Sequence, residues 1–75
     1  QQLEAIAREH EGVTEAFAVQ AGREVRVIVD AGAVDDARTR AIADAIAARV
    51  EREMTFPGEI KVSVLREVRA EASAR

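Results

Sequence analysis

The side chains that could carry acid–base, nucleophilic or metal chemistry are few in this sequence. His10 is the only histidine, and there is no cysteine. Thiolate ligands and thiol catalysis are therefore excluded, and a single imidazole cannot build a histidine cluster around a metal ion. Because His10 stands at the end of a helical pattern, on the side of Leu3 and Ile6, we interpret it as a structural residue.

Asp35 and Asp36 are adjacent carboxylates, and a pair of carboxylates can serve as general acid and general base. They directly precede a helical pattern, where aspartate caps exposed N–H groups and favours the positive end of the helix dipole. Capping is a sufficient explanation for both aspartates.

Gly22 and Arg23 could form a turn that approaches a phosphate, but no GxGxxG or GxxxxGK[ST] frame surrounds them. We therefore expect this chain not to be an enzyme, and to contain no catalytic, cofactor-binding or metal-binding residue.

Basic side chains could still form a surface for nucleic acid. Five of them lie in or beside the predicted strands: Arg23, Arg26, Lys61, Arg66 and Arg69. Glu24 and Glu67 are interleaved with them, the formal net charge is -3, and the chain has two phenylalanines but neither Trp nor Tyr for base stacking. These features favour a solvated mixed-charge surface over an RNA-binding one.

Two stretches have the spacing of helices. Apolar residues recur at helical intervals over residues 3–10, and Gly12 suits the left-handed position that ends many helices. Over residues 36–54 apolar residues recur at every fourth position. We predict a short helix over the first stretch and a long helix over the second.

Three stretches alternate between apolar residues and polar or small ones, which is the pattern of half-buried strands. They cover residues 13–21, 24–30 and 60–68. Gly22 can take a positive φ in a hairpin loop between the first two, and Pro57 with Gly58 forms a turn after the long helix. Gly22, Pro57 and Gly58 are thus the predicted structural turn residues.

The length of the hairpin loop decides which side chains face the helices, because neighbours across two strands share a face. We predict an odd loop over residues 21–23, since an even loop would set Phe17 against Arg26. The odd loop turns these side chains toward the helices: Phe17, Val19, Val25, Val27, Val29, Ile60, Val62 and Val64.

In order, these elements predict an α+β fold, a two-layer α-β-β-α-β module with a mixed three-stranded sheet and both helices on one face. The second and third strands should be parallel, because a helix connects them. The element order is similar to that of a type II KH domain, but the GXXG loop that clamps RNA is missing. Residues 1–68 would form the single domain, and residues 69–75 a C-terminal tail.

The opposite, open face of the sheet is the expected working surface, because it is less polar than a face turned only to water would usually be. Ile28 and Leu65 would form an apolar centre, with Arg26 and Lys61 at its margin. The candidate interface consists of Ala16, Ala18, Arg26, Ile28, Lys61, Ser63 and Leu65, with Gln20 on the same face.

The length of the chain points to dependence on a partner. A domain of 75 residues buries roughly 60% of the surface that its unfolded chain exposes, and one without disulfides often relies on a second subunit or on its parent chain. No apolar run reaches the length of a bilayer span, and no signal peptide opens the sequence. We expect a soluble, cytoplasmic segment without direct membrane contact, cut from a longer polypeptide because it starts without methionine.

Several stretches resemble the C-terminal end of the bacterial ribonuclease Y family. They are residues 11–13, the run VQAGREVRVIV at 19–29, the segment FPGEIKVSV at 56–64, and REVRA at 66–70. The resemblance covers nearly the whole chain, and its more specific parts are the run at 20–26 and the Pro57-Gly58 segment.

The resemblance implies a parent endoribonuclease of mRNA turnover, anchored at the cytoplasmic face of the cell membrane by an N-terminal helix. A coiled coil, a KH domain and a metal-dependent HD hydrolase domain would follow that helix. The divalent metal and the RNA substrate belong to those parts, and no HD metal ligand has a counterpart in this chain.

Two functions are open for the segment. It is either a non-catalytic assembly module, which self-associates as a homodimer or docks on the HD domain of its parent, or an accessory RNA-binding module of the same enzyme. An apolar open face would favour the first, whereas a basic face and a steep salt dependence would favour the second.

Overall fold

A computed structural model describes residues 2–55 and 58–75 of the chain. The elements are α1 (Gln2–Arg8), β1 (Val13–Val19), the 3₁₀ turn η1 (Gln20–Gly22), β2 (Glu24–Asp30), α2 (Asp36–Glu53) and β3 (Lys61–Glu67). The predicted α-β-β-α-β order and α+β class are confirmed, with boundaries that differ from the predicted ones by about two residues at most.

The start of α2 and the turn after α1 have the residues expected at those positions. The Asp35 carboxylate accepts a hydrogen bond from the N–H of Arg38 at 2.8 Å, so the predicted cap of α2 is present. After α1, Gly12 has a φ of +97°, which confirms the left-handed conformation expected of it. Each helix buries one apolar side: α1 buries Leu3, Ile6 and Ala7, and α2 buries Ile42, Ile46 and Val50.

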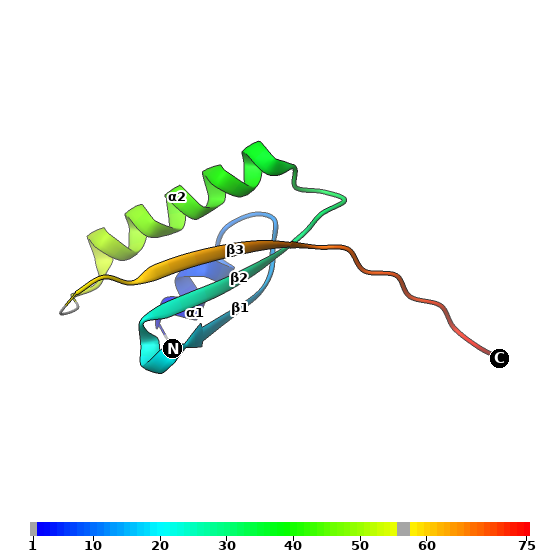
Figure 1. The fold of residues 1–75 in the computed structure, drawn as a ribbon, viewed down its shortest axis with the longest axis horizontal. Helices are drawn as coiled ribbons and strands as arrows, with labels where there is room; N and C mark the ends of the chain where they lie inside the picture. The colour runs from blue at the N-terminus through cyan, green and yellow to red at the C-terminus, as the bar shows by residue number, and fades with distance from the viewer. Residues whose placement is uncertain (1, 56–57) are drawn as a thin grey trace.

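The sheet has the strand order β1-β2-β3, with β2 antiparallel to β1 and parallel to β3. Figure 1 shows α2 running along one side of this sheet, and α1 packs against β1 and α2. Side chains from both helices meet Val25, Val27 and Val29 of β2 in a single core. One face of the sheet is therefore covered by helices and the other is open.

The predicted odd hairpin loop is wrong. Val19 pairs with Glu24, so the loop has the four residues 20–23. Gln20 and Ala21 adopt positive φ values of 54° and 58°, which is uncommon for residues other than glycine. Gly22 follows at +83°, as predicted. Because side chains alternate along a strand, this one added residue turns the side chains of residues 15–19 from the expected face to the other. A register shift between Val13 and Glu15 leaves Val13 packed against the core.

Two further predictions concern the segments on either side of β3. Gly58 has a positive φ of +146° in the turn before β3, whereas Pro57 lies outside the described residues.

Beyond β3, residues 68–75 are exposed and adopt neither helix nor strand, and Figure 1 shows them leading away from the sheet. Within the described part of the chain, no helix has both the length and the apolar character needed to cross a membrane.

Candidate protein-interaction face

The open face of the sheet carries a band of apolar side chains that crosses all three strands. Phe17 on β1 is 48% exposed and Leu65 on β3 is 47% exposed, and these are the two large hydrophobic side chains exposed within the strands that the structure describes. Half-buried Ile28 is on β2, the strand between β1 and β3, and is the register partner of Leu65. We call Phe17, Ile28 and Leu65 the apolar band.

A polar network closes the hairpin end of this face around Glu24, which is buried. Its carboxylate accepts hydrogen bonds from Ser63 Oγ at 3.0 Å, Arg26 Nε at 3.2 Å and Gln20 Nε2 at 3.1 Å. The hydrogen bond from Ser63, followed by the bond and charge of Arg26, lowers the pKa of Glu24 despite its burial. Glu24 is therefore held ionised, and the network fixes the side chains that border the apolar band.

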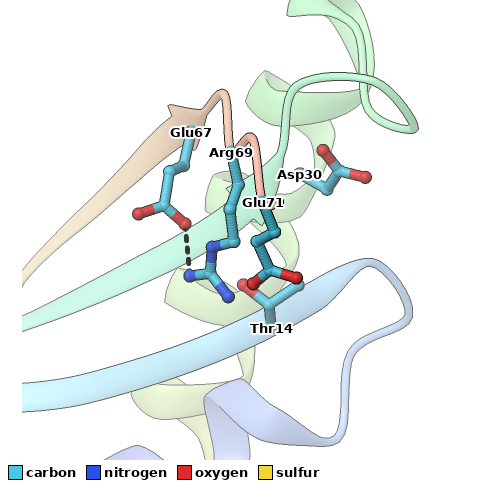
Figure 2. Close-up of a pocket in the computed structure, with 5 residues that line it drawn as sticks. All are labelled: Thr14, Asp30, Glu67, Arg69 and Glu71. Carbon is cyan, nitrogen blue, oxygen red and sulfur yellow. Dashed lines mark hydrogen bonds and ion pairs between the residues drawn. The ribbon is translucent and has the colours of Figure 1, made fainter. Parts of the chain in front are cut away.

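The opposite end of the face forms a shallow, mostly acidic pocket of about 280 Å³ (Figure 2), lined by Thr14, Asp30, Glu67, Arg69 and Glu71. Asp30 and Glu67 are partners in the β2–β3 register. The Arg69 guanidinium donates to Glu67 Oε1 at 2.7 Å. Three carboxylates against one guanidinium repel a phosphate, and no group of three residues in 2–55 and 58–75 is arranged to hold a metal ion.

The structure places five of the seven predicted interface residues on the open face and two elsewhere. Those on the open face are Arg26, Ile28, Lys61, Ser63 and Leu65. Ala16 and Ala18 are corrections, because the four-residue loop turns them toward the helices, opposite Val27 and Val25, and Ala16 is only 1% exposed. Gln20 lies in the loop, where it contacts Glu24.

Phe17 and Val19, predicted to face the core, share the open face with Glu15 instead. Sequence reasoning missed Phe17 because it judged the loop by glycine alone and did not foresee positive φ values at two other residues. A signal for the correct arrangement was present in the alanines. Small side chains at 16 and 18 permit α1 to pack closely on β1, which a phenylalanine there would prevent.

The candidate residues for acid–base or metal chemistry make structural contacts. His10 Nδ1 lies 3.1 Å from the carbonyl oxygen of Ile6, one turn earlier in the chain. Asp36 accepts a hydrogen bond from Arg66 Nη1 at 2.9 Å, while Asp35 caps α2. Arg66 also donates to the carbonyl oxygens of Val34 at 2.8 Å and Ala31 at 3.0 Å, so it holds the β2–α2 connection on the helix side of the sheet.

The five basic residues weighed for RNA binding do not form one patch. Arg66 reaches toward the β2–α2 connection, Arg26 is paired with Glu24, and Arg69 is paired with Glu67. Arg23 and Lys61 lie together at the hairpin end, where the N–H of Lys61 donates to the carbonyl oxygen of Arg23 at 2.9 Å. Pairing of three of the five cations with acids leaves a face of mixed charge.

Known proteins with similar sequences include ribonucleases Y from several bacteria. The chain is 51% identical over all 75 residues to ribonuclease Y of Lactobacillus gasseri, and spans 14% of that protein's length. It is 52% identical to ribonuclease Y of Geotalea uraniireducens and 53% identical to that of Thermus thermophilus, in each case over 73 residues, or 97% of this chain. These matches span 14% and 13% of the two relatives' lengths, respectively. No family model matches the sequence, and no solved structure matches the fold.

Proposed function

Because this chain belongs to the ribonuclease Y family, we propose that it is a non-catalytic docking module of a ribonuclease Y-like endoribonuclease that takes part in mRNA turnover. Phosphodiester hydrolysis and its divalent metal are assigned to the HD domain of the parent. RNA is reached through the parent, which is anchored at the cytoplasmic face of the membrane. The 75-residue segment contributes docking and not catalysis.

The observation that carries the proposal is the apolar band of Phe17, Ile28 and Leu65. Isolated exposed aliphatic side chains are common on protein surfaces, but this band continues across three strands and includes an aromatic residue that is about half exposed. Polar groups surround it, with Arg26 opposite Phe17 and Glu15 opposite Ile28 on the β1–β2 ladder, and with the paired Asp30 and Glu67 beyond Ile28 and Leu65. An apolar centre with a polar rim is the anatomy of a protein interface.

The occupant that we propose for this face is another part of the same parent chain, the HD domain. The segment spans about 14% of the length of the relatives it matches, so most of the parent's surface is available to cover it. A domain of this size also gains stability from burying an exposed face against a neighbouring domain. Self-association through the same face is the competing occupant.

A binding titration tests the proposal. The 75-residue chain is titrated by calorimetry into its parent ribonuclease Y truncated before this segment. Phe17→Asp and Leu65→Asp should each weaken binding by at least about tenfold, because truncating or charging the centre of an interface commonly costs 2 kcal/mol or more. Ala41→Asp on the exposed side of α2 is the matched control, since Ala41 lies on the helix layer and not on the open face.

The results of the titration distinguish the possible partners of the open face. Loss of binding with the two band variants and not with Ala41→Asp supports docking on the parent. If the wild-type chain does not bind but sediments as a dimer that Phe17→Asp dissociates, the band is a self-association surface. If the wild-type chain instead binds single-stranded RNA with a steep salt dependence, the accessory RNA-binding hypothesis replaces docking.

A further inference from the structure

The two edges of the sheet are protected to different degrees. On β1, the outward carbonyl oxygen of Ala16 accepts a hydrogen bond from Arg8 Nη2 at 2.9 Å, and the outward N–H of Ala18 donates to Glu4 Oε2 at 3.1 Å. Both partners come from α1, one turn apart. The side chains of α1 therefore satisfy the β1 edge and block it against another strand, which is a common way of managing edge strands.

The β3 edge has no such cover. The N–H of Lys61 bonds to β2 at Arg23, and the carbonyl oxygen of Glu67 accepts from Ala31. In a parallel ladder, alternate residues bond to the neighbouring strand, so residues 61, 63, 65 and 67 face β2. The N–H and C=O groups of Val62, Val64 and Arg66 then point outward, and no hydrogen bond from elsewhere in 2–55 or 58–75 reaches them.

We propose that the β3 edge pairs with the β3 edge of a second copy of this chain, antiparallel and about a two-fold axis at Val64. The two sheets would join into one continuous sheet, with about six backbone hydrogen bonds between the copies. The proposal goes beyond docking through the open face, because it uses the edge of the sheet and a different partner.

Charge complementarity selects this register. With Val64 opposite its own copy, Lys61 lies opposite the second copy's Glu67, and Glu59 opposite its Arg69. Moving the register by two residues in one direction sets Glu59 against Glu67. Moving it by two in the other direction sets Lys61 against Arg69. Opposite charges stabilise directly facing positions and like charges destabilise them, so the register centred on Val64 is favoured over both neighbours.

The same register provides a partner for Val68, which is 86% exposed. Continuing the alternation of β3, Val68 falls on the helix side and opposite Ile60 of the second copy. An open groove of about 540 Å³ lies beside Ile60, and its apolar lining comes from Val50, Ala47 and Ala48 of α2. An exposed valine thus meets an apolar groove in the register that the charges select.

Sedimentation velocity of the 75-residue chain over a concentration series tests the pairing. The wild-type chain should form a concentration-dependent dimer. Lys61→Glu and Glu67→Lys should each weaken it by at least about tenfold, because each change replaces two attractive contacts by two repulsive ones. The double variant should restore the dimer. Residues 61 and 67 stand at opposite ends of one strand, so only contact between copies lets one change compensate the other.

A second set of variants avoids any effect on folding. Val68→Asp should also weaken the dimer at least tenfold without changing the circular dichroism spectrum, whereas Ala74→Asp in the same exposed tail should do neither. Phe17→Asp, on the far edge strand, should leave the dimer intact even if it abolishes docking. A monomeric wild-type chain at all concentrations, failure of the double variant to restore association, or a dimer unaffected by Val68→Asp would each overturn the proposal.

Discussion

Phe17 and Arg26 face each other across the β1–β2 ladder on the open side of the sheet. This pairing places the aromatic ring among solvent-exposed side chains and sets Ala16 and Ala18 under α1. The apolar band and the close packing of the first helix are thus two consequences of one register.

The register predicts a contrast between two apolar side chains. Phe17→Ala should lower the free energy of unfolding by less than about 1 kcal/mol, because the ring is about half exposed. Ile46→Ala should lower it by about 2–5 kcal/mol, because Ile46 is fully buried in the core. Urea unfolding of the two variants measures both values. A larger loss for Phe17→Ala than for Ile46→Ala would show that β1 faces the other way.

The hairpin loop depends on the positive φ of Gly22. Gly22→Val should destabilise the fold by roughly 1 kcal/mol or more, because a β-branched residue is strained at a φ of +83°. A Cβ at this position meets no atom within 4 Å, so the cost is conformational rather than steric. Gly22→Asn is the matched control and should cost less, since asparagine tolerates this region. Equal melting temperatures for the valine variant and the wild type would contradict the loop geometry.

Glu24 predicts a specific pH dependence. Its pKa is lowered in the folded chain, first by the hydrogen bond from Ser63 and then by Arg26. A depressed carboxyl pKa stabilises the fold above the unfolded value of about 4.5, and this contribution is lost as the pH falls through the folded value. Ser63→Ala should therefore raise the pKa of Glu24, measured by NMR titration of its side chain, and move the acid loss of stability to higher pH. An unchanged Glu24 titration would mean that Ser63 does not hold the carboxylate.

The proposed division of labour with the parent predicts no catalysis by this segment. The purified chain should not cleave RNA in the presence of Mg²⁺, Mn²⁺ or Zn²⁺, because its histidine and the two aspartates at the start of α2 have structural partners. Fluorogenic RNA provides the assay. Metal-dependent cleavage that copurifies with the chain and is lost in Asp30→Asn or Glu67→Gln would place a catalytic centre in the pocket of Figure 2 and contradict the account.

Local patterns were enough to predict the elements of this fold. The long helix follows from apolar residues at every fourth position and from Asp35 at its start, and the parallel pairing of β2 and β3 follows from the helix between them. On β2 and β3, alternation alone assigned Ile28 and Leu65 to the open face, where the structure has them.

The orientation of β1 could not be predicted in the same way, because it depends on the parity of the loop. Whether the loop has an odd or an even number of residues depended on Gln20 and Ala21, whose positive φ values no propensity rule favours. Tertiary packing decides between the two orientations, since α1 can approach β1 closely only over small residues such as Ala16. Two of the three residues of the apolar band, Ile28 and Leu65, were therefore recognisable from the sequence, and Phe17 was not.

NMR of isoleucine and leucine methyl groups tests most directly the claim that the open face docks on the parent. The labelled chain is mixed with its parent ribonuclease Y truncated before this segment. The methyl signals of Ile28 and Leu65 should shift or broaden, whereas those of Ile42 and Ile46, which lie on the buried side of α2, should keep their positions. Shifts confined to α2, or a spectrum that does not respond to the parent at all, would contradict the account.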